Sequence, residues 1–367
     1  MGSDFPVTFG RLQLYGDVAY HHAENAAADA QNLLKFLYSD LKLDRRFFSS
    51  RIRSALFYKR DPELLQEVRK ELQALINKLF HALQNGTDVR QEKFIEMQLG
   101  HFLAIYPFLE PESGMTLHVP QKVDAQGKKS WQLLEYEVQK FKLSPPSLGS
   151  PICAFGLLPK QLGAPLLLFK GTPHPTSPGA YLSFWADFVP GYTVGGALFS
   201  FFAKKKISAW IDDAYAHAQM GIKIYGKSLG GALALLTENA HPGKVAEVHA
   251  YCAPGLLVTG QSTASVHLYF RENDPVQLLG NYHPHWHLYK ILTAMKKNMF
   301  LAHLRAFPGL SNLVVIQRDT LCESKRFARK CFTAAHFLIS IPIFIVTSSI
   351  LLVKTAYMFT TALYKQQ

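Results

Sequence analysis

The chain has 367 residues, of which 48% are hydrophobic and 18% charged, and this balance excludes a wholly disordered protein. Lys and Arg number 39 against 27 Asp and Glu, so the net charge of +12 favours an anionic partner, either nucleic acid or acidic lipid. Mean hydropathy is +0.02, which is high for so basic a chain, so the apolar residues must be concentrated in part of it. Four cysteines, none of them spaced as Cys-x-x-Cys, exclude a disulfide framework and a zinc ribbon.

The first part of the chain, residues 1–114, is expected to be a helical region. Asp61 followed by Pro62 is typical of a helix start, and leucines then recur at helical spacing until Asn85 and Gly86 end the run. A second helix is expected over residues 89–103, and the stretches 17–41 and 45–59 also have helical character.

From residue 115 onward, short apolar runs alternate with helical stretches. Strands are expected in the ranges 116–119, 132–143, 152–158, 165–169, 221–225, 245–251, 265–270, 285–292 and 312–317. Strands that alternate with helices predict an α/β fold with a mainly parallel sheet covered on both faces. Residues 115–324 are therefore expected to form one α/β domain.

One motif in this domain carries chemistry: Gly226-x-Ser228-x-Gly230. A short apolar strand leads into it, and a leucine-rich helix that starts at Leu229 leads out of it. This order is typical of a nucleophile elbow, in which small neighbours let a tight turn expose the serine at a helix N-terminus. Dinucleotide-binding and phosphate-loop glycine patterns do not occur in the sequence, so no cofactor is expected.

With these features the sequence resembles the class 3 (fungal-type) lipases, which have the α/β-hydrolase fold. The elbow over residues 226–234 is similar to the family's G-x-S-L-G-G-A-L-A, residues 169–172 to its F-R-G-[ST] oxyanion motif, and residues 273–276 to its N-D-x-V segment. The resemblance covers residues 165–304. The chain departs from the family at Lys227, where the family usually has His.

The resemblance implies a Ser-Asp-His triad, in that chain order. Asp274 follows an apolar strand and is the expected acid, although an aspartate before Pro275 is also common in plain turns. His303 is favoured as the base, with His283 as the alternative. The expected oxyanion donors are the backbone N–H of Leu229 and the backbone N–H, and the hydroxyl, of Thr172.

Three histidines with alternating spacing, His283, His285 and His287, could face one way on a strand. Neither a carboxylate nor a cysteine nearby completes a ligand set, so no metal site is expected.

The C-terminal part, residues 325–367, carries the apolar excess. The segment that begins at Cys331 and ends at Val353 has no charged residue and is long enough as a helix to cross a hydrocarbon core of about 30 Å. A basic flank precedes it: Lys325, Arg326, Arg329 and Lys330. This flank predicts a membrane-associated protein with its main body on the cytosolic side; an interfacial segment and a soluble core helix are the alternatives.

Together these features predict a membrane-associated serine hydrolase, an esterase or lipase that acts on acyl esters. The alternative is a catalytically inactive α/β-hydrolase fold that serves as a membrane-anchored interaction protein. Nucleic-acid binding is supported by the net charge alone, and no recognition motif accompanies it, so no nucleic-acid partner is expected.

Overall fold

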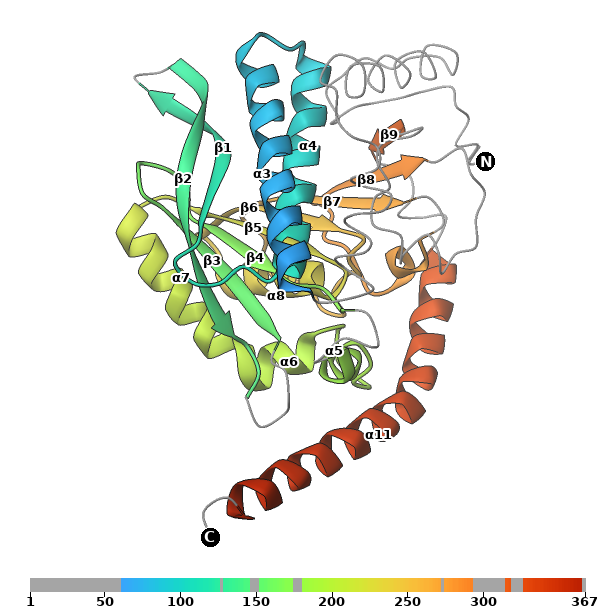
Figure 1. Ribbon diagram of the computed structural model, residues 1–367. Helices are drawn as coiled ribbons and strands as arrows, with labels where there is room; N and C mark the ends of the chain where they lie inside the picture. The colour runs from blue at the N-terminus through green and yellow to red at the C-terminus, as the bar shows by residue number, and fades with distance from the viewer. Residues whose placement is uncertain are drawn as a thin grey trace, which may run out of the picture.

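The computed structural model describes residues 61–125, 128–145, 152–173, 180–271, 274–292, 314–317 and 326–364. The helical stretches expected over residues 17–41 and 45–59 lie outside the described residues. The described elements form layers around one sheet. The last helix of the chain, α11, is long and extends beyond these layers (Figure 1).

Two helices, α3 (Pro62–Gln84) and α4 (Val89–Ile105), begin the described chain, followed by the short helix η3 (Tyr106–Leu109). The start of α3 is as predicted, because the side chain of Asp61 caps the helix by accepting from the backbone N–H of Glu63 at 3.0 Å. Its end is also as predicted: Asn85 is the C-cap, and Gly86 follows with a φ of 82°.

A nine-stranded sheet follows, and its strands lie side by side in chain order. The strands are β1 (Thr116–Ala125), β2 (Lys128–Lys142), β3 (Cys153–Pro159), β4 (Leu166–Phe169), β5 (Ile222–Lys227), β6 (Val245–Tyr251), β7 (Ser265–Arg271), β8 (His287–Leu292) and β9 (Val314–Gln317). Strands β4 to β8 run parallel, whereas β1 to β4 and the pair β8–β9 are antiparallel. The sheet is therefore mixed, and its parallel half is the half that contains the elbow.

Helices cover both faces of this sheet. The connections carry α5 (Ala180–Asp187), α6 (Gly196–Leu198), the π-helical turn η5 (Phe199–Ala203), α7 (Lys204–Ala218), α8 (Leu229–Ala240) and η6 (Pro275–Leu278). Alternate residues of β4 separate the two cores: Leu166 and Leu168 pack with α3 and α4, whereas Leu167 and Phe169 pack with α5 to α8. All four residues of β4 are buried, which explains its continuous apolar sequence. The α/β fold class is thus observed, while the domain boundaries stay a prediction.

The C-terminal helix α11 (Arg326–Tyr364) contains Pro342 near its middle and is curved in Figure 1. Its segment Lys330–Tyr357 is long and apolar enough to cross a membrane and is mostly exposed. Several of its serine and threonine hydroxyls donate to backbone carbonyls within the helix, as Ser340 does to His336 at 2.6 Å and Thr347 to Ile343 at 2.8 Å. The apolar C-terminal helix is therefore present; of the basic flank, Lys325 lies outside the described residues.

Candidate active site

Ser228 lies at the junction between β5 and α8, the place that the sequence predicted for it. Its backbone has φ 55° and ψ −122°, an unfavourable conformation for a residue with a side chain. The turn is fixed by two hydrogen bonds: the N–H of Ser228 donates to the carbonyl of Tyr251 at 2.9 Å, and its own carbonyl accepts from the N–H of Ala232 at 3.0 Å. Ser228 is half-buried, so part of it is accessible from outside.

The two glycines of the motif allow this turn. A Cβ atom on Gly226 would collide with the backbone of Gly230, and a Cβ atom on Gly230 would collide with the backbone carbonyl of Phe169. Strand β5, helix α8 and the end of β4 therefore approach one another at a distance that only glycine permits. The requirement for small residues on both sides of the serine is confirmed.

Leu229 is the first residue of α8 and is fully buried. Because the first four N–H groups of a helix have no partner within it, the N–H of Leu229 lies at a helix end where negative charge is favoured. Helix α8 runs on to Ala240, long enough to carry a helix dipole.

Thr172 follows β4 at the same edge of the sheet. Phe169 is paired with Gly226 in the parallel register of β4 and β5, and a Cβ atom on Gly171 would collide with the backbone carbonyl of Lys227. The segment around Thr172 is thus packed against the residue that precedes Ser228. The hydroxyl of Thr172 donates to Oδ2 of Asp187 at 2.6 Å.

Asp187 was missed in the sequence analysis, because it lies 15 residues from Thr172 and no local pattern joins the two. As the last residue of α5, it connects this helix to the end of β4.

Asp274 follows β7, the second strand over from β5 in the sheet, and its side chain is fully buried. It caps η6, because its Oδ1 accepts from the N–H of Val276 at 2.9 Å. A carboxylate without exposure requires further hydrogen-bond partners or charges nearby to be stable in that place. The cap alone is compatible both with a turn aspartate and with the acid of a triad.

The predicted base, His303, lies outside the described residues. The alternative, His283, is half-buried in the turn before β8, where its Nδ1 accepts from the N–H of His285 at 3.3 Å. His285 and His287 are both exposed, and only His287 belongs to the strand. Among the described residues, no group of three or more His, Cys, Asp or Glu side chains could hold a metal ion.

Helix α11 lies beside this site, which the sequence analysis had not predicted. It contacts α5 and η6, the elements that carry Asp187 and follow Asp274. Ring contacts join α11 to the segment at α5: His336 stacks on Phe188 at 5.2 Å between ring centroids, and Trp185 meets Phe344 at 6.3 Å. The apolar C-terminal helix therefore packs against elements that flank the candidate active site.

Comparisons with known proteins add little to this geometry. No family model matches the chain, and no curated protein matches it at a significant level. Among solved structures, the chain is similar to a triacylglycerol lipase from Penicillium expansum, at 13% identity over 52% of this chain and 86% of the lipase, with a TM-score of 0.32. At that TM-score the likeness carries no argument about this chain.

Proposed function

We propose that this protein is a membrane-associated serine hydrolase that cleaves acyl esters. The observation that carries the proposal is the conformation of Ser228: a non-glycine residue with φ 55°, between a buried strand and the N-terminus of a helix, flanked by two glycines that admit no side chain. Such strain persists only where the surrounding structure enforces it, and it is concentrated at functional sites. A plain turn at this place could use glycine and avoid the strain.

In the proposed mechanism the Oγ of Ser228 attacks the ester carbonyl carbon while His303 takes the hydroxyl proton. Asp274 orients His303, and the N–H groups of Leu229 and Thr172 donate to the oxyanion that forms. When the tetrahedral intermediate collapses, the bond to the alcohol breaks, and His303 returns the proton to that alcohol. Water then attacks the acyl-enzyme in the same way and releases the carboxylic acid.

Two features support a lipid or other acyl ester as the proposed substrate class: the candidate active site and the apolar helix α11 beside it. Helix α11 packs against α5 next to Thr172, so a bilayer that held α11 would also lie close to the nucleophile. We propose that the main body lies on the cytosolic side, with Lys330 and the basic residues before it at the membrane surface.

The experiment is hydrolysis of p-nitrophenyl butyrate by the full chain in detergent micelles. The expected result is that Ser228→Ala removes the activity. Ser208→Ala is the matched control, because Ser208 lies within hydrogen-bond range of a histidine, 2.8 Å from Nε2 of His241, but inside helix α7 and not at a strand–helix turn. Loss of activity in both variants, or in neither, would contradict the proposal.

A further inference from the structure

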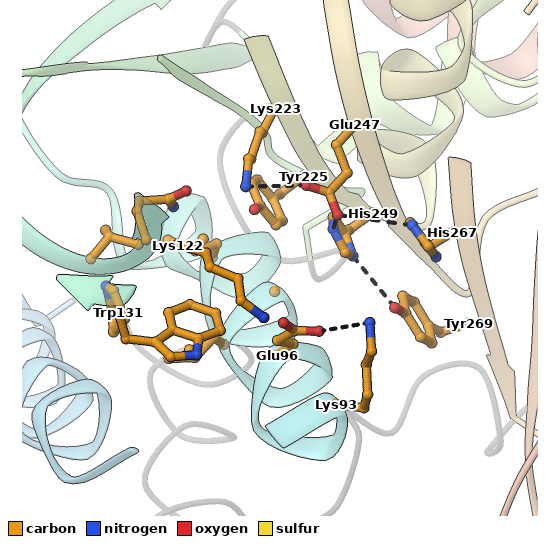
Figure 2. A pocket seen from close by; sticks show the side chains of 16 residues that line it. Lys93, Glu96, Lys122, Trp131, Lys223, Tyr225, Glu247, His249, His267 and Tyr269 are labelled. Atoms are coloured by element: carbon orange, nitrogen blue, oxygen red, sulfur yellow. Dashed lines mark hydrogen bonds and ion pairs between the residues drawn. The ribbon is translucent and has the colours of Figure 1, made fainter. Parts of the chain in front are cut away.

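A second group of polar side chains lies between α4 and the middle of strands β5, β6 and β7, and none of its members is a residue of the candidate active site (Figure 2). They surround a cavity of about 270 Å³. The strands contribute Lys223, Tyr225, Glu247, His249, His267 and Tyr269. The volume is just below the range of about 300–1,000 Å³ that is usual for ligand sites, which limits an occupant to a small molecule.

The strand side of this cavity is a row of flat rings. Tyr225 stacks on His249, and His249 stacks on His267, with 5.0 Å between ring centroids in both pairs. These residues are direct partners in the parallel registers of β5, β6 and β7, so the sheet itself sets the stacking. The rings of three neighbouring strands therefore form one continuous stacked surface on this wall.

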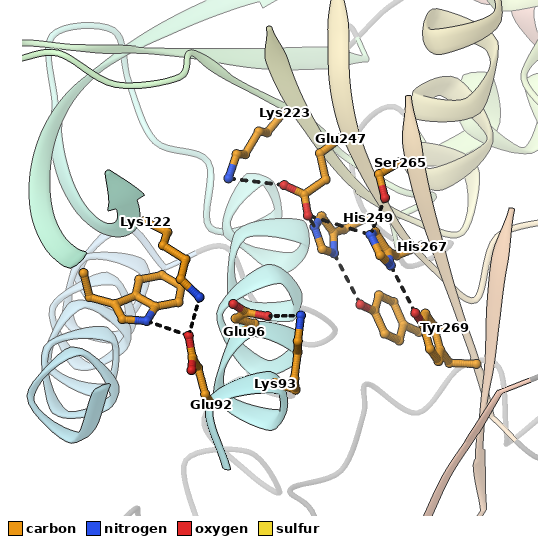
Figure 3. A network of polar contacts seen from close by, with 12 residues as sticks. Glu92, Lys93, Glu96, Lys122, Lys223, Glu247, His249, Ser265, His267 and Tyr269 are labelled. Carbon is orange, nitrogen blue, oxygen red and sulfur yellow. Dashed lines mark hydrogen bonds and ion pairs between the residues drawn. The ribbon is translucent and has the colours of Figure 1, made fainter. Parts of the chain in front are cut away.

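Glu247 is the centre of a polar network on the same wall (Figure 3). One carboxylate oxygen lies 2.8 Å from Nε2 of His249, and the other lies 3.2 Å from Nζ of Lys223. Burial alone would raise the pKa of Glu247, but His249, Lys223 and His267 outweigh burial and hold that pKa well below its ordinary value. Glu247 is therefore ionised and already has cationic or hydrogen-bonding partners.

The opposite wall is formed by α4 and the β1–β2 hairpin. Lys122 lies 5.6 Å from the centroid of the Trp131 ring, and both of these side chains donate to Glu92, at 2.6 Å and 3.1 Å. Lys93 lies 3.6 Å from Glu96 on the same helix. Three lysines thus line the cavity, Lys93, Lys122 and Lys223, and each of them has a carboxylate partner: Glu96, Glu92 and Glu247 respectively.

A structural role alone does not explain this cluster. Partly buried ion pairs contribute little net stability, and apolar side chains that filled the cavity would serve packing at least as well. The described residues hold no set of ligands for a metal ion. Each ammonium group carries three N–H donors and has a carboxylate partner here, so an anion could accept from the remaining donors of three lysines at once.

We propose that this cavity binds a small organic anion, in which a carboxylate or phosphate group is attached to a flat or short apolar body. Lys93, Lys122 and Lys223 would hold the oxygens, and Trp131 and the ring of Tyr225 would contact the body. The site is independent of the ester hydrolysis proposed above, because no residue is shared between the two.

The test is isothermal titration calorimetry of the full chain in detergent micelles with benzoate, with phenyl phosphate, and with benzyl alcohol as the neutral analogue. Saturable binding is expected for at least one of the two anions and for benzyl alcohol no binding is expected. The double variant Lys93→Ala, Lys122→Ala should weaken the affinity for that anion by roughly tenfold, since each exposed charge contributes modestly.

The matched control is Lys160→Ala, which removes an exposed lysine paired with Glu135 outside the cavity. It should leave the affinity unchanged. The proposal is overturned if neither anion binds, if benzyl alcohol binds as tightly as benzoate, or if the double variant and the control have the same affinity. The two anions also distinguish the two possible anionic groups. Tighter binding of phenyl phosphate would indicate that the lysines bind a phosphate, and tighter binding of benzoate that they bind a carboxylate.

Discussion

The hydroxyl of Thr172 donates a hydrogen bond of 2.6 Å to Oδ2 of Asp187, and this contact joins the end of β4 to the end of α5. The neighbouring residue, Phe188, stacks on His336 of α11, whose imidazole also hydrogen-bonds to the backbone of Asp187. One short chain of contacts therefore connects the proposed oxyanion donor to the apolar C-terminal helix. If Thr172 acts in catalysis, Asp187 is the residue that positions it.

Removal of this contact should slow the chemical step. We expect Asp187→Ala to lower kcat for ester hydrolysis by about tenfold, equal to about 1.4 kcal/mol of transition-state stabilisation, with KM little changed. Thr172→Ser retains the hydroxyl and should stay close to wild type. Asp213→Ala removes an exposed aspartate on α7 and is the control. A change in KM alone, with kcat preserved, would place Asp187 outside the oxyanion site.

The glycines of the elbow should be intolerant of any side chain. Gly226→Ala and Gly230→Ala each drive a Cβ into backbone atoms that cannot rotate away, so we expect a loss of about 3 kcal/mol or more in the free energy of unfolding. Gly243→Ala is the comparison, because Gly243 has a φ of +82° but open space around its Cβ position. It should cost only about 1 kcal/mol. Urea unfolding followed by circular dichroism measures the free energy of unfolding of all three variants. Equal losses in the three would mean that the strained backbone, and not the collision of the Cβ atom, causes the loss of stability.

The polar network around Glu247 predicts a loss of stability in acid. Burial and the charge of His249 lower the pKa of His267 from 6.5 to about 3. Between these two pH values His267 is protonated in the unfolded chain but not in the folded protein. The free energy of unfolding therefore falls as the pH falls from about 6.5 to 3. Glu247 acts in the same direction, since its folded pKa is below the ordinary value and its contribution is lost in acid. The groups that face His267 are Glu247, His249, Ser265, His287, Tyr289 and Lys93.

The variant His267→Gln should therefore lose less stability than wild type between pH 7 and pH 4.5, by about 1–3 kcal/mol. His217→Gln, at an exposed position on α7, should follow the wild-type curve. Urea unfolding at both pH values measures the difference. If His267→Gln has the wild-type pH dependence, burial and His249 do not hold the imidazole neutral in the folded protein.

Membrane association should depend on the apolar surface of α11. Ile345 is 58% exposed in the middle of the segment Lys330–Tyr357, and a lysine there would cost about 3 kcal/mol in a bilayer core. We expect Ile345→Lys to reduce the fraction of protein that floats with liposomes in a density gradient. Val89→Lys is the matched control, since Val89 is 65% exposed on α4. Equal flotation of the two variants would argue that α11 is not the membrane contact.

Elements that are specified by a few neighbouring residues could be predicted from the sequence. The Asp61 cap, the apolar runs of β3 to β7 and the strand–turn–helix order around Ser228 are all read within a few neighbouring residues, and the structure has them at the expected places. Thr172, Ser228 and Asp274 each follow an apolar run within a few residues, and the structure has all three after parallel strands, at the same edge of the sheet.

The polar cavity around Glu247 and the packing of α11 were not predicted, because both depend on contacts between segments that are distant in the sequence. Glu247 and His249 alternate along β6 and His267 lies on β7, so polar residues at alternate positions of apolar strands were the available signal. Lys122 and Trp131, which line the same cavity, come from a hairpin more than a hundred residues before Glu247, and only the fold brings these residues together. The packing of α11 on α5 is of the same kind, because an apolar helix does not specify in its sequence which surface it contacts.

The central claim is that Ser228 is a nucleophile, and covalent labelling tests it most directly. The full chain in detergent micelles is treated with a fluorophosphonate probe, digested, and mapped by mass spectrometry. We predict a single phosphonyl adduct, on the peptide that contains Ser228, which is retained in Ser208→Ala and absent from Ser228→Ala. An unlabelled wild type, or labelling that persists in Ser228→Ala, would contradict the account and would favour an inactive hydrolase fold that serves as a membrane-anchored interaction protein.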